Sequence, residues 1–295
     1  MSYVVTGATG QVGSAVVDYL LAKSVSVHVI IRSEDKAQAF RSRNIQVTIA
    51  DLTDVEVLTK VFQGAKAVFA MNPPGYEKPD LQLAAANVSQ ALATAIQAAK
   101  VERVVVLSSV GAELSAKTGC ILTTHTLEEA LKESAPQVVI VRCAWFTENW
   151  LSAASAVKAG HTPVLGSMLQ KLDRKIPHVA TNDIGRVVSE YMLKPNSEVD
   201  KLTVVQLEGP EPYSPNDIAK AVGDVLGNSV AAAPLTDDHI REILSKHAWP
   251  KTTTDNWIEM VKSFDDNTIH WTTDEKITRI QGKVTIADVL KTSLK

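Results

Sequence analysis

The chain has 295 residues, of which 45% are hydrophobic and 21% charged, so a disordered chain is excluded and a full core can be buried. A net charge of −3 excludes the strongly basic surface that is typical of proteins gripping a nucleic-acid backbone. With only Cys120 and Cys143, neither a disulfide framework nor a cysteine zinc site is expected.

Strands and helices alternate regularly through about residue 142. Short apolar runs predict strands at residues 3–6, 25–31, 46–50, 67–71, 103–108 and 138–142. Helical spacing of apolar residues predicts helices at 14–21, 35–43, 54–62, 81–100 and 127–134. Strands that are continuous apolar runs are typical of a parallel sheet covered by helices on both faces. We therefore expect an α/β fold with a doubly wound parallel sheet, which is a Rossmann fold.

After residue 145 the alternation stops. One further strand, at residues 203–207, is predicted to return to the sheet, and residues 210–295 are mostly helical in pattern. We expect the sheet domain at residues 1–147 and a smaller, mainly helical substrate lobe over most of residues 148–295. In a doubly wound fold such a lobe would cover the carboxyl edge of the sheet, where ligands bind.

A glycine-rich loop stands directly between the first strand and the first helix. Its G-x-x-G-x-x-G spacing permits a tight turn and brings the backbone close to a pyrophosphate, whose charge the free N–H groups of the helix start attract. An ordinary glycine turn is the alternative, but the strand–loop–helix context favours an NAD(P)-binding domain over residues 1–147. The predicted cofactor contacts in the loop are Gly7, Thr9, Gly10, Gln11, Val12 and Gly13.

Arg32 follows the second strand, where NAD-specific folds often carry an acidic residue that holds the ribose 2′-hydroxyl. A guanidinium can bind a 2′-phosphate through two hydrogen bonds, so NADP(H) is predicted over NAD(H). The alternative is a solvated strand-end charge, because Glu34 and Asp35 are near enough to compete for Arg32.

Other cofactor contacts are expected where later strands end. Asp51 and Leu52 would flank the adenine, although Asp51 can equally be a capping residue. Asn72 would lie along the ribose and nicotinamide, and Ser108 would complete the cofactor set. Its neighbour Ser109 could orient a substrate carbonyl, with strand-end capping as the alternative.

These motifs together resemble the atypical short-chain dehydrogenase/reductase superfamily, and within it the NmrA-like family. The run from Arg142 to Asn149 resembles that family's R-x-x-x-F-x-E-N, and residues 182–185 and 207–210 resemble its later landmarks. The resemblance covers most of the chain and is weakest after about residue 230. It implies NADP(H) binding and either reduction of quinones and related molecules or a redox-sensing role without chemistry.

The sequence departs from that superfamily at its Y-x-x-x-K motif. No tyrosine lies between Tyr76 and Tyr191, and His125 and Glu129 stand at the tyrosine and lysine spacing. The quinone reductases that the chain resembles also carry histidine near this place. His125 is therefore a candidate acid, predicted just before a helix, with a backbone-bonded histidine as the equal alternative.

Aromatic residues after the sixth strand are candidates for the substrate site. Trp145 and Phe146 could form an apolar roof over a flat substrate, or pack the two lobes together. Glu148 and Asn149 are expected mainly to tie the lobes. No spacing among the seven histidines makes a metal site.

The leading interpretation is an NADPH-dependent oxidoreductase that transfers hydride to a quinone, enone or carbonyl compound. The alternative is a non-catalytic NADP(H)-binding sensor acting through a protein partner, and an NADP-dependent isomerase is a weaker third. The sequence does not decide whether the protein forms a homodimer. With no signal-peptide pattern and no apolar run of the roughly 18–20 residues that span a membrane, we expect a cytoplasmic protein that binds neither membrane nor nucleic acid directly.

Overall fold

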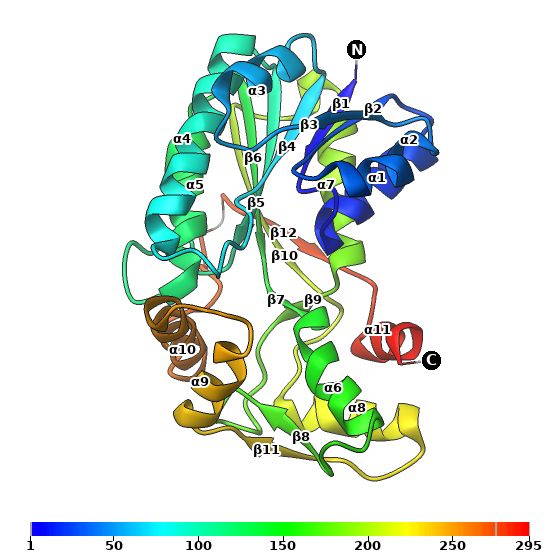
Figure 1. Cartoon of the computed structure of the whole chain (residues 1–295), viewed down its shortest axis with the longest axis vertical. Helices are drawn as coiled ribbons and strands as arrows, with labels where there is room; N and C mark the ends of the chain where they lie inside the picture. The colour runs from blue at the N-terminus through cyan, green and yellow to red at the C-terminus, as the bar shows by residue number, and fades with distance from the viewer. Residues whose placement is uncertain (1, 275, 295) are drawn as a thin grey trace.

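The computed structural model describes residues 2–274 and 276–294. A parallel eight-stranded sheet with helices on both faces forms the larger lobe, and a smaller lobe lies beyond the carboxyl ends of the strands (Figure 1). The strand order is β12-β10-β6-β5-β4-β1-β2-β3, which confirms the doubly wound α/β fold. The strands are β1 (Tyr3–Thr6), β2 (Val27–Ile31), β3 (Gln46–Ile49), β4 (Ala67–Ala70), β5 (Arg103–Ser109), β6 (Gln137–Cys143), β10 (Leu202–Glu208) and β12 (Thr278–Gln281).

Two apolar layers bury the sheet. On one face α1 (Gln11–Ala22), α2 (Ala37–Arg41) and α7 (Thr181–Leu193) pack against the strands. On the other face lie α3 (Val55–Phe62), α4 (Leu81–Ala99) and α5 (Leu122–Leu131). The central strands β1 and β4 are buried on every residue, as their continuous apolar runs predict.

The sheet takes more from the second half of the chain than the sequence indicates. The strand predicted at residues 203–207 is β10, but β12 at the sheet edge was not predicted. Three of its four residues are polar, and it is mostly exposed, so it lacks an apolar strand pattern. The helix α7 also belongs to the larger lobe. Gly185 lets it approach α1 so closely that a methyl group at this position would overlap Ala15.

The smaller lobe is mainly helical, with a short parallel pair of strands. Its elements are α6 (Leu151–Lys158), β8 (Val164–Ser167), α8 (Pro215–Leu226), β11 (Ala231–Pro234), α9 (Asp237–Ser245), α10 (Lys251–Asp265) and α11 (Ile286–Ser293). A second parallel pair, β7 (Trp145–Phe146) with β9 (His178–Val179), lies where the lobes join (Figure 1).

The helix predicted from residue 127 begins earlier, at Leu122, because the 3-10 turn η2 (Gly119–Ile121) runs directly into it. The hydroxyl of Thr123 donates to the Cys120 carbonyl at 2.8 Å, and that of Thr124 to the Ile121 carbonyl at 2.8 Å. These local bonds stabilise the extra turn. His125 therefore lies within α5, and its predicted place just before a helix was wrong.

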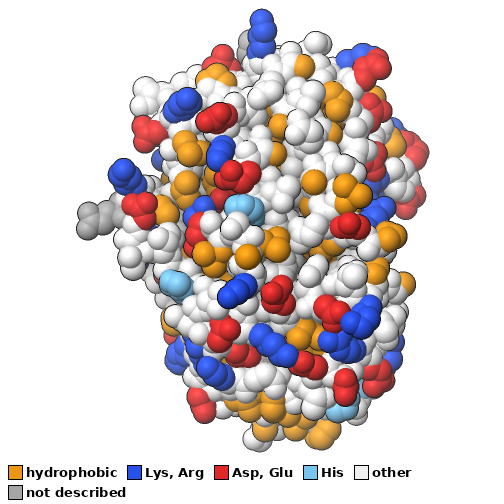
Figure 2. Space-filling view, turned by 90° about the vertical axis from the view of Figure 1, so that its left-hand side faces the viewer, with side chains coloured by type: hydrophobic (Ala, Val, Ile, Leu, Met, Phe, Trp, Pro, Cys, Tyr) orange, Lys and Arg blue, Asp and Glu red, His pale blue; other side chains and the backbone are white. Residues whose placement is uncertain are grey.

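The surface of the α4 and α10 side carries lysine and arginine side by side with aspartate and glutamate (Figure 2). No large area of one sign is visible on this face, in keeping with the small net charge of −3. Within residues 2–274 and 276–294, no helix is both long and apolar enough to cross a membrane.

Candidate functional site

Three adjoining cavities follow the carboxyl edge of the sheet into the smaller lobe. We call the first the glycine groove; its volume is about 130 Å³. The second, the edge pocket, has a volume of about 230 Å³, and the third, the lobe chamber, about 700 Å³. The glycine groove is lined by Gly7, Thr9, Gly10, Ile30, Ile31, Arg32, Ala50, Leu52, Met71, Pro73 and Pro74.

Glycine is required at two positions of the loop for geometric reasons. Gly7 has φ +64°, and a Cβ added there would lie 2.7 Å from the Met71 sulfur. A Cβ at Gly13 would overlap the carbonyl oxygen of Gly7, so only glycine lets α1 start this close to the loop. Gln11 and Val12 form the first turn of α1 and do not line the groove. At the glycine loop, therefore, the groove is bounded by backbone, as close approach of a pyrophosphate requires.

Arg32 lies exposed at the wall of the glycine groove. Its expected competitor, Glu34, instead pairs with Arg41, which also lowers the pKa of the Glu34 carboxyl through their hydrogen bond. Among the described residues Arg32 forms no ion pair. The guanidinium is thus available to an anion in the groove, as the 2′-phosphate interpretation needs.

Asp51 is held by its own loop. Its carboxylate accepts hydrogen bonds from the Thr53 hydroxyl at 2.7 Å and the Thr53 backbone N–H at 2.9 Å, and these lower the pKa of the Asp51 carboxyl. It does not line the glycine groove, whereas its neighbour Leu52 does. The geometry corresponds to the capping alternative for Asp51.

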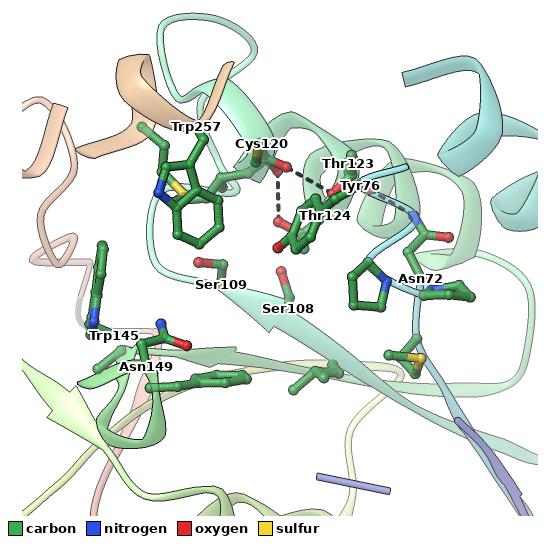
Figure 3. Close-up of a pocket in the computed structure, with 18 of the residues that line it drawn as sticks. Asn72, Tyr76, Ser108, Ser109, Cys120, Thr123, Thr124, Trp145, Asn149 and Trp257 are labelled. Atoms are coloured by element: carbon green, nitrogen blue, oxygen red, sulfur yellow. Dashed lines mark hydrogen bonds between the residues drawn. The ribbon is translucent and has the colours of Figure 1, made fainter. Parts of the chain in front are cut away.

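The edge pocket lies where β4, β5 and β6 end (Figure 3). Ser108 and Ser109 line it from the end of β5, and Asn72 from the loop after β4. Three residues, Met71, Pro73 and Pro74, line both this pocket and the glycine groove, so the two cavities share a wall. The other residues that line it are Tyr76, Leu107, Cys120, Ile121, Thr123, Thr124, Ala144, Trp145, Phe146, Asn149, Trp257, Met260 and Phe264.

The two serines differ in how firmly they are held. Ser108 donates its hydroxyl to Glu128, which is buried and also accepts from Arg142 Nε at 2.9 Å and Nη2 at 2.7 Å. Among the described residues, the Ser109 hydroxyl bonds only the carbonyl of its neighbour Val110, at 3.0 Å. Ser109 is therefore the freer hydroxyl, because its contact is a local side chain-to-backbone bond.

His125 does not share the wall of the edge pocket with Ser109. Its Nδ1 lies 2.9 Å from the Ala112 carbonyl oxygen, and the residue lines neither the edge pocket nor the lobe chamber. Starting α5 at Leu122 places Thr123 and Thr124 on the pocket wall instead. Asn72 lines the pocket but is bonded through its amide to the Thr123 carbonyl at 2.9 Å, so it fastens its loop to α5.

Tyr76 is a site residue that the sequence reasoning missed. Its ring packs on Trp249, with centroids 4.3 Å apart, and edge-on against Trp257 at 5.6 Å. The hydroxyl points into the edge pocket on the side of Ser108 and Ser109 (Figure 3), and no group in residues 2–274 and 276–294 is hydrogen-bonded to it. Burial raises the pKa of this phenol well above its ordinary value, so it remains a hydrogen-bond donor.

The residues of β7 and η3 (Thr147–Trp150) divide between the two expected roles. Trp145 and Phe146 line the edge pocket, and Trp145 also packs edge-on against Phe264 with centroids 5.1 Å apart. Glu148 accepts from the Thr181 backbone at 2.9 Å and so ties the lobes at the start of α7. Asn149, expected to do the same, instead lines both the edge pocket and the lobe chamber.

Cys120 lies on the pocket wall but is not a nucleophile there. Burial raises the pKa of its thiol to about 12, so the reactive thiolate is not formed near neutral pH. Its role in the pocket is that of a small apolar side chain.

The family comparison matches almost the whole chain: the model of the NmrA-like family covers residues 2–288. Among characterised relatives, Prestalk A differentiation protein A of Dictyostelium discoideum is 25% identical over 248 residues, which is 83% of this chain and 76% of that protein. Quinone oxidoreductase 2 of Escherichia coli (strain K12) is 30% identical over 156 residues, 52% of this chain and 51% of that protein.

Solved structures share the fold over the full length. An NADPH-dependent quinone oxidoreductase from Escherichia coli, solved as a complex with NADPH, superimposes with a TM-score of 0.79. The superposition covers 100% of both chains at 20% sequence identity. Likeness at this level of identity establishes the fold.

Proposed function

The chain belongs to the NmrA-like family, and we propose that it is an oxidoreductase that uses NADPH to reduce a quinone, enone or carbonyl compound. The observation that carries the proposal is the wall shared by the glycine groove and the edge pocket, formed by Met71, Pro73 and Pro74. A dinucleotide with its phosphates at the glycine loop would reach over this wall, so its nicotinamide end would enter an apolar pocket with hydroxyl groups.

The groove residues fit NADP(H). Glycine at position 13 lets α1 begin directly against the loop, so the N–H groups of the helix start can face a pyrophosphate, and Arg32 is available to bind a 2′-phosphate. The name of the superimposed Escherichia coli protein, an NADPH-dependent quinone oxidoreductase bound to NADPH, supports the same cofactor. When bound, NADPH supplies the hydride, and the chain positions the acceptor.

Ser109 is the proposed orienting group for the acceptor. Its hydroxyl, at the end of β5, would donate to the acceptor oxygen on which negative charge develops. His125 is the second candidate, although it does not line the edge pocket: Nδ1 lies against the Ala112 carbonyl, so a proton would have to come from Nε2 and the histidine would have to turn toward the acceptor. A quinone needs little acid help, since its reduced oxygen is a stable anion, and this suits a site without the Y-x-x-x-K tyrosine.

The proposal is tested by following NADPH absorbance with a panel of quinones and enones, using the wild type and the variants Ser109→Ala and His125→Gln. We expect turnover with at least one quinone, and about a tenfold loss in kcat/KM for Ser109→Ala because one charge-assisted hydrogen bond disappears. No turnover with any acceptor, in a protein that binds NADPH tightly, would refute the enzyme proposal.

The second candidate function is an NADP(H)-binding regulator. A regulator needs no free acid or base, and two candidate polar groups already have partners: Ser108 is bonded to Glu128, and the Nδ1 of His125 faces a backbone carbonyl. The relative named Prestalk A differentiation protein A supports it as well. Tight NADPH binding without turnover, together with a partner captured only in one redox state of the cofactor, would establish this function.

A further inference from the structure

The lobe chamber collects an unusual share of the chain's aromatic residues. Four of the five tryptophans line it, namely Trp145, Trp150, Trp249 and Trp257, together with Tyr76. A cluster of large rings normally fills a core, yet here the rings surround a cavity of about 700 Å³. A concave, mainly apolar surface lined by large rings is typical of a ligand site.

The remaining walls of the lobe chamber are mostly apolar, with Asn149, Ser152, Thr162 and His247 as the polar residues among them. Ala153 and Ala156 line it from α6, Ala233 from β11, and Ile243 and Leu244 from α9. No aspartate, glutamate, lysine or arginine is among the described residues that line it, and His247 is its only histidine. An ionic group would find no carboxylate, ammonium or guanidinium to pair with on these walls, so a neutral ligand fits the chamber better than a charged one.

The chamber is continuous with the proposed reaction site. Tyr76, Trp145, Asn149 and Trp257 line both the lobe chamber and the edge pocket. The edge pocket alone, at about 230 Å³, is smaller than the roughly 300–1,000 Å³ of most complete ligand sites. It has room for one flat ring system beside a nicotinamide, and the chamber begins directly behind that ring.

We propose that the lobe chamber binds the bulky apolar extension of an uncharged acceptor whose electrophilic ring lies in the edge pocket. The substrate class is then a quinone or enone with a large apolar substituent, and small water-soluble quinones are poor substitutes. This inference rests on the proposed function for the ring, whereas binding of the extension depends only on the chamber. Tyr76 and Trp257 stand at the junction and would contact the bond between ring and extension.

The test compares menadione with menadione bearing a decyl chain on its free ring carbon. Each methylene transferred from water to an apolar wall improves binding roughly fourfold, so a chain that is even partly buried should raise kcat/KM at least about tenfold. Equal kcat/KM for the two quinones in the wild type would overturn the proposal.

Variants that fill the chamber separate this effect from general hydrophobic attraction. Ala156→Phe and Ala233→Phe each place a ring in the chamber, one from α6 and one from β11, outside the edge pocket. Ser155→Phe is the matched control, because this exposed residue lies on the same helix but does not line the chamber. We expect the filled variants to lose the decyl preference and keep menadione reduction, while the control keeps both. Equal loss in Ala156→Phe and Ser155→Phe would overturn the proposal.

Tryptophan fluorescence gives a readout that does not depend on turnover. Trp145 and Trp257 line both the edge pocket and the chamber, so a bound quinone ring should quench the emission of the NADP⁺-loaded protein, and the titration gives the dissociation constant. Ala156→Phe should weaken binding of the decyl quinone at least about tenfold. If neither quinone is reduced, the proposed function fails, but this titration still decides the chamber. Equal dissociation constants for the two quinones would refute the extension site.

Discussion

The glycine groove and the lobe chamber are built in different ways. The groove is centred on a loop of seven consecutive residues, from Gly7 to Gly13, whose close backbone packing requires glycine at both of these ends. The chamber is assembled from residues as far apart as Tyr76 and Trp257, and its shape comes entirely from side-chain bulk. An added side chain at Gly13 therefore disrupts the loop itself, whereas a substitution on the chamber wall can change the ligand without loss of the fold.

The largest effect is expected at the groove. Gly13→Val forces a side chain into the carbonyl of Gly7, so α1 must move away from the loop, and NADPH affinity should fall more than about 100-fold. Isothermal titration of NADPH measures this directly. Gly64→Ala is the control: its φ of +71° makes it strained, but open space surrounds it, so it should cost only about 1 kcal/mol of stability. Unchanged NADPH binding in Gly13→Val would contradict the role of the groove.

The β7–β9 pair, where the two lobes join, should respond to pH. His178 on β9 is buried, and burial lowers the pKa of its imidazole to about 4, while its Nε2 accepts from the Trp150 indole at 2.9 Å. Between about pH 6.5 and 4 the unfolded state therefore binds more protons at His178 than the folded state does. The free energy of unfolding decreases as pH falls through that window. The loss should reach about 3 kcal/mol.

Urea unfolding as a function of pH measures that loss. The variant His178→Gln can keep a donor and an acceptor at this place without a proton equilibrium, so it should flatten the profile. The matched change His239→Gln, on an exposed residue of α9, should leave the profile as in the wild type. A wild-type profile that is flat from pH 6.5 to 4 would contradict the assignment.

Cofactor choice should depend on one exposed side chain of the groove. Arg32→Ala removes a charge-assisted pair of hydrogen bonds, so NADPH affinity should fall about 10- to 100-fold, with NADH affinity unchanged. Arg41→Ala is the control, because Arg41 is engaged with Glu34 outside the groove. Wild-type protein that binds NADH as tightly as NADPH would show that Arg32 is only a solvated strand-end charge.

The contrast between the glycine groove and the lobe chamber also explains which parts of the site could be predicted from the sequence. The sheet and the lining roles of Gly7, Gly10 and Arg32 follow from local patterns, because a glycine loop and the strand around it are neighbours in sequence. The chamber left no such pattern, since its walls come from segments that only the folded smaller lobe brings together. The position of His125 was missed for a local reason, namely that threonine hydroxyls extend α5 backwards by bonding to the preceding turn.

The smallest effect is expected at Tyr76, where the edge pocket meets the chamber. Tyr76→Phe removes one neutral hydroxyl and keeps the ring that packs on Trp249 and Trp257, so stability should be preserved. Losing one hydrogen bond to the acceptor should lower kcat/KM about three- to tenfold. Because burial raises the pKa of this phenol, the ratio of variant to wild type should not change with pH through the neutral range.

Steady-state kinetics with a reducible quinone, combined with thermal unfolding, decides the role of Tyr76. Tyr19→Phe is the matched control, because its hydroxyl bonds Asn182 on the exposed surface and lies in none of the three cavities. Lower Tm with unchanged kcat/KM would make Tyr76 a packing residue. Lower kcat/KM with unchanged Tm would show that the hydroxyl missing from the Y-x-x-x-K position is supplied here from the loop after β4, by a residue that belongs to both the reaction site and the chamber.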